Sequence, residues 1–244
     1  MANDDIHRAA AALRSARRIT VLTGAGISAE SGVPTFRGPD GLWRKFRVED
    51  LATPEAFAHD PVLVWEWYDW RRGLIAKCDP NPGHFSLAKF EGHFTEFLLV
   101  TQNVDGLHRK AGNRKVAELH GNIWDVRCLR EGTVREDLRV PLPEIPPRCE
   151  CGALLRPNVV WFGEALPQEV FAQATRAAMQ CDLFFVIGTS GLVQPAASLP
   201  LYAKRAGAVT IELNLEPTPL SPLVDHSFLG RSGHLLPKLE ELLS

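Results

Sequence analysis

A glycine-rich segment near the N-terminus has the spacing of a nucleotide-binding turn. Gly24-x-Gly26-x-x-Ala29 follows the apolar run at residues 19–23. In the dinucleotide fingerprint, missing side chains at such positions let backbone N–H groups approach a pyrophosphate at the start of a helix. A tight strand-to-helix turn without a ligand has the same pattern. The strand expected before the glycines and the helix expected after them favour the phosphate-binding interpretation.

Three other apolar runs end in polar or small residues: Gln102-Asn103-Val104-Asp105 after residues 97–101, Gly188-Thr189-Ser190 after 183–187, and Asn214-Leu215-Glu216 after 209–213. The carboxyl ends of parallel strands meet at one edge of a sheet, so we expect one site there. A dinucleotide fold usually places an acidic residue for the ribose about 20 residues after the glycines, at the end of a second strand. Here an aromatic segment follows instead. Asn214 and Glu216 are the substitute we expect, although a turn with a surface glutamate has the same sequence.

His120, between Leu119 and Gly121, is the best candidate for a general base among the eight histidines. Imidazole titrates near neutrality, and a site lined by polar strand ends needs such a group to move a proton. A single histidine beside leucine is more often a core or capping residue than a catalyst, but the polar strand ends favour the catalytic interpretation here.

Composition and charge limit the class of protein. The 244 residues are 45% hydrophobic and 23% charged, which is typical of a globular chain with one large domain, with or without a smaller insert. Lys and Arg total 27 against 29 Asp and Glu, so no overall basic surface favours nucleic acid or an anionic membrane. The N-terminus is acidic, without a signal-peptide pattern, and the apolar runs are too short to span a bilayer. We therefore expect a cytoplasmic protein, with a monomer favoured.

Short apolar runs alternate with helical segments along most of the chain. We expect helices at 5–17, 167–180, 195–206 and after Pro237, and strands at 19–23, 97–101, 159–162, 183–187 and 209–213. Such runs are typical of strands buried on both faces of a parallel sheet. The alternation predicts an α/β fold with a Rossmann-like, doubly wound parallel sheet.

Two stretches break this alternation. Residues 38–92 are helical and aromatic, and residues 122–158 contain three cysteines and a proline-rich run. We expect these insertions, a helical module and a zinc-ribbon-like module, to form a smaller domain. The Rossmann-like domain would then be discontinuous, consisting of 1–37, 93–121 and 159–244, with a cleft between the two domains.

Taken together, the motifs resemble the sirtuin family over nearly the whole chain. Residues 24–38, GAGISAESGVPTFRG, look like the family's first signature, which is highly specific. The other matches follow in family order: TQNVDGLH at 101–108, LHG at 119–121, RPNVVWFGE at 156–164, GTS at 188–190, VQPA at 193–196 and Asn214.

The resemblance implies an NAD-dependent protein-lysine deacylase that consumes NAD. In the family's mechanism the acyl-lysine oxygen attacks the nicotinamide ribose and nicotinamide leaves. The histidine, here His120, then activates a ribose hydroxyl to attack the imidate formed in the first step, and free lysine and O-acyl-ADP-ribose result. By position, Asn103 and Asp105 match catalytic residues that orient the ribose and nicotinamide. The other residues implied to bind NAD are Gly24, Ala25, Gly26, Ala29, Thr35, Phe36, Arg37, Gln102, Gly188, Thr189, Ser190, Asn214, Glu216 and Ser232.

The resemblance also implies how an acylated protein would bind. The residues Val160, Trp161, Phe162 and Gly163 match the segment that pairs with the substrate backbone as an added strand.

Within the family the chain is most like class III, through Leu51-Ala52-Thr53-Pro54 and Tyr68-x-x-Arg71. Those enzymes favour acidic acyl groups, so desuccinylation or demalonylation is expected and deacetylation is possible. Positions three apart share a helix face, so Tyr68 and Arg71 can hold a distal carboxylate, for which the small Ala52 leaves room. Without the resemblance, an arginine extending beside Trp67 toward solvent is the simpler interpretation.

The cysteines depart from the family's pattern. Members with a structural zinc usually carry two Cys-x-x-Cys pairs, whereas here Glu131 stands three residues after Cys128 and the second pair is Cys149-Glu150-Cys151. Zinc in a closed structural site takes four ligands. Either Glu131 or another group supplies the fourth ligand, or the metal has been lost, and both outcomes remain open.

Two other functions are compatible with an NAD pocket. A mono-ADP-ribosyltransferase would transfer the ribosyl group to protein or water, and a sensor would bind NAD or ADP-ribose without turnover. The presence of His120, Asn103 and Asp105 together argues against the sensor. The partners we expect are acylated lysine side chains of proteins, without nucleic acid or membrane.

Overall fold

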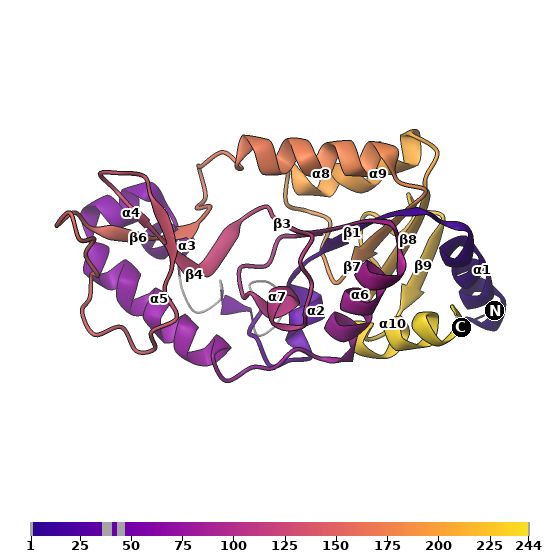
Figure 1. Ribbon diagram of the computed structural model, residues 1–244, viewed down its shortest axis with the longest axis horizontal. Coiled ribbons are helices and arrows are strands. Elements are labelled where there is room, and N and C mark those ends of the chain that lie inside the picture. The colour runs from indigo at the N-terminus through magenta and orange to yellow at the C-terminus, as the bar shows by residue number, and fades with distance from the viewer. Residues whose placement is uncertain (1, 36–40, 43–46, 244) are drawn as a thin grey trace.

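The computed structural model describes residues 2–35, 41–42 and 47–243 (Figure 1). Its larger part is built on a six-stranded parallel sheet of order β3-β2-β1-β7-β8-β9. The strands are β1 (Arg18–Thr23), β2 (Glu96–Thr101), β3 (Val116–Glu118), β7 (Leu183–Ile187), β8 (Val209–Asn214) and β9 (His226–Leu229). The chain builds outward from β1 first to one side and then to the other, so the order reverses between β1 and β7. The predicted Rossmann-like, doubly wound fold is confirmed, and ligands of such sheets bind beside this reversal.

Alternating side chains of the central strands build one apolar core on each face of the sheet. Val21 and Phe185 lie in the core covered by α1 (Ala2–Ser15), α6 (Pro82–His93) and α10 (Ser232–Glu241). Leu22 and Val186 lie in the core covered by α8 (Gln168–Gln180) and α9 (Leu199–Arg205). Figure 1 shows these two groups of helices on opposite sides of the sheet. Because both faces are covered, the central strands β2 and β7 are nearly continuous apolar runs.

The smaller part combines segments from both predicted insertions. Its helices are α3 (Val48–Leu51), α4 (Pro54–His59) and α5 (Pro61–Ile75), and its antiparallel sheet has the order β5-β4-β6, with β4 (Gly121–Cys128), β5 (Val134–Glu136) and β6 (Leu155–Val159). Trp65 of α5 is fully buried, and its indole N–H donates to the Leu155 carbonyl at 2.8 Å, which joins the helix to the sheet. Within the 38–92 segment, α6 packs on the large sheet instead, through Leu87 and Phe90. The domain limits drawn from the sequence stay a prediction.

Several elements differ from those expected. The strand predicted at 159–162 is wrong, because β6 ends at Val159 and pairs antiparallel with β4, with Leu155 opposite Cys128. A short apolar run does not reveal which sheet it joins. The helix expected after Pro237 begins already at Ser232, and the one expected at 195–206 is a 3-10 turn (Ala196–Ser198) followed by α9.

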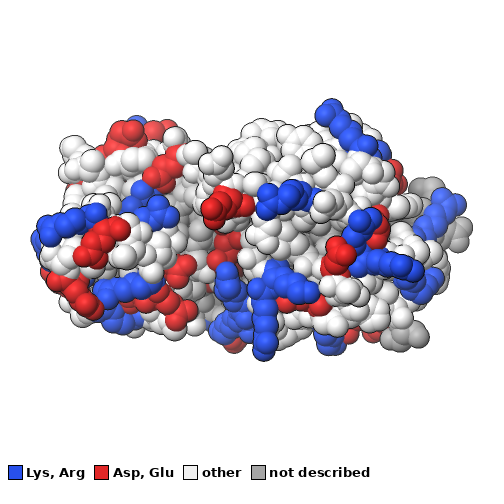
Figure 2. Space-filling model, turned by 45° about the horizontal axis from the view of Figure 1, so that its top comes forward, with Lys and Arg blue, Asp and Glu red and all other residues white. Residues whose placement is uncertain are grey.

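The surface agrees with the near-balanced composition. Figure 2 shows acidic and basic side chains intermingled over the face that it presents. Among the described residues, no helix combines the length and the apolar character needed to cross a bilayer.

Candidate active site

A cavity of about 680 Å³ lies between the large sheet and the smaller part. It is lined from the sheet by the turn after β1 and by the ends of β2, β7 and β8, and from the smaller part by α5 and the segment after β6. Most of the residues singled out in the sequence lie on its wall: Gly24, Ala25, Gly26, Thr35, Ala52, Tyr68, Arg71, Gln102, Asn103, His120, Val160, Trp161, Phe162, Gly163, Gly188, Thr189, Ser190, Asn214 and Glu216.

Three of the expected site residues that the structure describes are not among those that line the cavity. Phe36 and Arg37 lie outside the described residues. Ala29 and the buried Asp105 are not among the lining residues. Ser232 is also absent from the lining, and its hydroxyl donates to the Glu30 carboxylate at 2.9 Å at the start of α10.

The glycines of the turn bring two backbones together. Gly24 and Gly26 begin the short helix α2 (Ala25–Ala29), and the Gly26 N–H donates to the Gly188 carbonyl at 2.8 Å. A Cβ at Gly24 would lie 2.8 Å from the Gly188 oxygen, and one at Gly26 would lie 2.7 Å from the Gly188 Cα. The glycines are therefore required to pack the end of β1 against the end of β7, whatever ligand the turn also takes.

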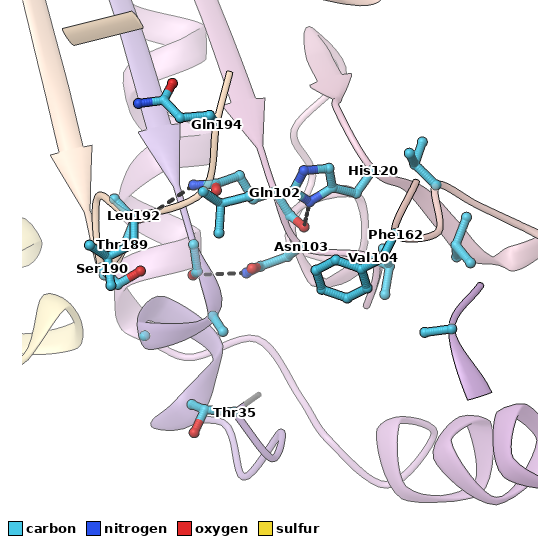
Figure 3. Close-up of a pocket in the computed structure, with 18 of the residues that line it drawn as sticks. Thr35, Gln102, Asn103, Val104, His120, Phe162, Thr189, Ser190, Leu192 and Gln194 are labelled. Carbon is cyan, nitrogen blue, oxygen red and sulfur yellow. Dashed lines mark hydrogen bonds between the residues drawn. The ribbon is translucent and has the colours of Figure 1, made fainter. Parts of the chain in front are cut away.

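Asn103 is fixed just after the end of β2 by three hydrogen bonds, of which Figure 3 draws one from its amide. Its amide donates to the Gly24 carbonyl at 3.0 Å and contacts the Ser28 hydroxyl at 3.1 Å, and its backbone N–H donates to the Thr101 hydroxyl at 3.0 Å. The amide nitrogen is thus committed to the protein, which leaves the amide oxygen to accept from a ligand. Ser28, which this arrangement uses, was missed by the sequence reasoning, although it lies within the first signature.

His120 has a defined tautomer. Its Nδ1 lies 2.9 Å from the Gln102 carbonyl oxygen (Figure 3). A carbonyl only accepts, so Nδ1 carries the proton and Nε2 keeps a free lone pair. Burial lowers the pKa of His120, although the bond to Gln102 opposes this. The imidazole is therefore neutral at pH 7 and able to take a proton at Nε2.

Asp105 lies behind the cavity wall in a buried polar cluster. Its carboxylate accepts the Leu107 N–H at 2.8 Å, and burial raises its pKa, an effect that the Leu107 and Ser28 hydrogen bonds and the charge of Arg71 oppose. His84 contacts the same Ser28 hydroxyl at 3.3 Å, and burial lowers the pKa of His84 to about 4. Ser28 therefore connects Asn103, Asp105 and a neutral histidine.

One end of the cavity is formed by the segments that follow β7 and β8, and a buried carboxylate supports it. Gln102 donates to the Thr189 hydroxyl at 2.9 Å, and the Asn214 amide donates to the Thr189 carbonyl at 2.9 Å. Glu212, fully buried in β8, accepts the hydroxyls of Thr218, Ser221 and Ser227. Because Asn214 and Thr218 line the cavity, Glu212 holds the loop that forms this end. Glu212 was also missed, and its signal is a carboxylate between the apolar residues Ile211 and Leu213 of a strand.

The other end of the cavity holds a buried cation and a phenol. Tyr68 and Arg71 lie on α5 with only 3% and 5% of their surfaces exposed. The Arg71 Cζ lies 4.9 Å from the centroid of the Trp67 ring, so the contact with Trp67 exists, but the guanidinium is buried rather than extended to solvent. Burial lowers the pKa of Arg71, which Tyr68 and Asp105 oppose, and raises that of Tyr68. An arginine stays charged in proteins, so this end favours an anion.

The three cysteines of the smaller part come together with Glu131. The ligand atoms of Cys128, Glu131, Cys149 and Cys151 all lie within 4.8 Å of one another, and the sulfurs of Cys128 and Cys151 are 3.5 Å apart. A zinc ion about 2.3 Å from each sulfur would separate neighbouring ligand atoms by roughly 3.8 Å. The four residues therefore fit a tetrahedral metal, with Glu131 in the fourth position, and none of them lines the cavity.

Comparison with known proteins identifies the family. A model of the Sir2 family matches residues 24–195. The chain belongs to the Sir2 family. It is 58% identical to an NAD-dependent protein deacylase of Aquifex aeolicus over 92% of this chain and 95% of that protein. It is 52% identical to an NAD-dependent protein deacylase of Pyrococcus furiosus over 90% of each chain.

Solved structures of the family have the same fold. A Sir2 homologue in complex with NAD superposes with a TM-score of 0.90 at 45% identity, covering 98% of this chain and 95% of that one. Sir2Af2 bound to a myristoylated histone peptide superposes with a TM-score of 0.79 at 35% identity, covering 98% and 96%. The sirtuin resemblance is thereby confirmed.

Proposed function

We propose that this chain is an NAD-dependent protein-lysine deacylase that removes acidic acyl groups, succinyl and malonyl, in preference to acetyl. The relatives named NAD-dependent protein deacylase support the reaction. The observation that carries the acyl preference is the buried pair Tyr68 and Arg71 on the wall of the cavity that also contains His120. The class III likeness of Leu51-Ala52-Thr53-Pro54 supports the same preference.

The acyl preference follows from desolvation. A carboxylate moved from water into this cavity needs a partner, because an unpaired charge in an apolar site is costly. Arg71 can supply a bidentate partner, and Tyr68, whose pKa is raised by burial, keeps its proton and can donate a further hydrogen bond. An acetyl group has no carboxylate to pair with Arg71 or to accept a hydrogen bond from Tyr68, so its binding gains less from these two side chains.

The catalytic roles are assigned to residues whose geometry suits them. NAD supplies the electrophilic ribose, and nicotinamide is the leaving group. His120, with Nδ1–H held by Gln102, takes a proton from a ribose hydroxyl at Nε2. Asn103 presents its amide oxygen to the ribose, and Asp105 stabilises positive charge from behind the wall. The loop that Glu212 holds, with Asn214 and Glu216, binds the adenosine end, and the glycine turn faces the pyrophosphate.

The acylated segment of the substrate would pair along residues 160–163. The Val160 N–H donates to the His120 carbonyl and the Phe162 N–H donates to the Ala52 carbonyl, each at 2.9 Å. These two hydrogen bonds hold the segment between His120 and the end of the cavity that contains Tyr68 and Arg71. A substrate strand added beside it would place the lysine in the cavity.

Cys128, Glu131, Cys149 and Cys151 would hold a structural zinc in the smaller part. A closed site of this kind contributes folding energy and takes no part in the reaction.

The test is a comparison of matched peptides. Purified chain is incubated with NAD and one peptide carrying succinyl-, malonyl- or acetyl-lysine, and nicotinamide and O-acyl-ADP-ribose are followed by mass spectrometry. We expect a higher kcat/KM for the two acidic acyl groups. Equal kcat/KM for all three refutes the acyl preference, ADP-ribosylated protein without deacylation supports the transferase instead, and binding without nicotinamide release supports the sensor.

A further inference from the structure

We call the end of the cavity formed by Tyr68 and Arg71 the acyl pocket. Trp161 contacts the Tyr68 phenol of this pocket directly. Its indole Nε1 lies 2.9 Å from the Tyr68 hydroxyl oxygen, and both side chains are 3% exposed. This contact joins the segment expected to pair with the substrate backbone to the side chain expected to recognise the acyl group.

The chemistry of the two groups fixes the direction of the hydrogen bond. An indole N–H donates and cannot accept, so the Tyr68 oxygen accepts from Trp161. A phenol has a single proton, and this proton is then left for a partner other than Trp161. Burial raises the pKa of Tyr68, so the proton stays on the phenol at neutral pH.

The indole is held on several sides. The Arg156 Cζ lies 3.5 Å from the centroid of the Trp161 ring, and the Phe57 ring centroid lies 5.3 Å away. The Trp161 backbone N–H donates to the Glu164 carboxylate at 2.8 Å, and Arg156 pairs with the same carboxylate at 2.6 Å. With the ring stacked and its backbone anchored, the N–H keeps a constant direction toward Tyr68.

We propose that Trp161 determines acyl specificity as a positioning residue, by occupying the lone pair of Tyr68 so that the phenol proton is directed at the distal carboxylate of the acyl-lysine. The inference rests on the proposed function, because it gives Tyr68 an acidic acyl group to recognise. The preference for acidic acyl groups would then depend on Trp161, a side chain that neither carries a charge nor binds the acyl carboxylate.

A double-mutant cycle separates orientation from packing. Trp161→Phe keeps an aromatic ring against Arg156 and Phe57 but removes the N–H, and Tyr68→Phe removes the hydroxyl that the N–H orients. The readout is the ratio of kcat/KM for succinyl-peptide to kcat/KM for acetyl-peptide, measured for wild type, both single variants and the double variant.

We expect Trp161→Phe to lower the succinyl-to-acetyl ratio about three- to tenfold, the effect of one hydrogen bond, mainly through the KM for succinyl-peptide. In the Tyr68→Phe background the same change should leave the ratio where it is. If Trp161→Phe lowers both activities by one factor, or lowers the ratio equally in both backgrounds, Trp161 only fills space and the inference is wrong.

One further variant and the wild-type ratio keep the outcomes distinct. If Trp161→Phe has a low Tm, benzothienylalanine at position 161 keeps the bicyclic shape without the N–H, and its ratio decides the matter. A wild type that removes both acyl groups equally well refutes the proposed preference together with this inference. A wild type that prefers succinyl but shows no coupling between the two positions refutes the inference alone.

Discussion

Arg71 is the side chain whose replacement tests the acyl pocket most directly. Arg71→Met removes the guanidinium while keeping much of the volume of the stem, so the packing against Trp67 survives in part. In the folded chain the guanidinium is almost fully buried, 4.9 Å from the Trp67 ring centroid and 5.8 Å from that of Tyr68. A succinyl or malonyl carboxylate bound to the variant would lose its only proposed counter-charge.

The size of the effect follows from desolvation. Truncating one partner of a buried, hydrogen-bonded charge pair costs about 2–5 kcal/mol. At about 1.4 kcal/mol per factor of ten, the kcat/KM for succinyl-peptide should fall roughly 30- to 4,000-fold. Arg71 also acts electrostatically on Asp105, which would affect every substrate alike. The succinyl-to-acetyl ratio of kcat/KM cancels that contribution and is the quantity to measure.

The adjacent residue is a matched control. Arg72 is fully buried on the same helix, but its guanidinium faces Asp137, with 3.6 Å between Nη2 and Oδ1, and does not line the cavity. Arg72→Met should lower Tm and leave the ratio unchanged. If Arg71→Met and Arg72→Met change Tm and the ratio in the same way, Arg71 has no special relation to the acyl group and the reasoning fails.

Four further predictions concern the rest of the molecule. His120→Ala should lower kcat about 10²–10⁴-fold with NAD still bound, as measured by single-turnover kinetics and NAD titration. Because burial lowers its pKa, the kcat/KM of wild type should rise with pH through a pKa below the ordinary value of about 6.5, and a limb above that value would contradict a buried neutral base. Glu212→Gln should raise the KM for NAD roughly tenfold with little change in the KM for acyl-peptide, because it disturbs three hydroxyl contacts under one end of the cavity. Equal changes in both KM values would contradict the proposal that this end binds NAD. Glu131→Ala should lower zinc content and Tm, whereas Glu150→Gln, an exposed carboxylate beside the cysteines, should change neither. Metal analysis giving no zinc in active wild type would refute the metal site.

The convergence of the strand ends that we propose to bind NAD was predictable because its signals are local. Strands such as Leu183–Ile187 are buried on both faces, and their ends bring Thr189, Asn103 and Asn214 to one edge. Periodicity and the rule for parallel sheets are sufficient for that inference. The edge strands β3 and β9, of three and four residues, escaped it because so short a run has no clear period.

Other features depend on contacts between segments far apart in the chain. Glu212 lies between the apolar residues Ile211 and Leu213 in the sequence, and only the fold brings Thr218, Ser221 and Ser227 to its carboxylate. The segment at 159–162 was expected in the large sheet, but the pairing of Leu155 with Cys128 draws the preceding strand into the small one. Because β6 joins the small sheet, the residues that follow it lie beside α5, and Trp161 contacts Tyr68.

The division of the cavity between two parts of the molecule makes its two specificities separable. The residues proposed for NAD come from strand ends of the large sheet, whereas Tyr68, Arg71 and Trp161 come from α5 and the segment after β6. The helix spacing of Tyr68 and Arg71 allows both to face one ligand, and we propose that the burial of both, with Trp161 bonded to the phenol, makes that end selective for charge. Changes at the α5 end should therefore alter the acyl ratio at constant KM for NAD, and changes at Glu212 should do the reverse. His120, the proposed base, is hydrogen-bonded to Gln102 on one side and to Val160 on the other. It is therefore the residue whose loss should affect every acyl group equally.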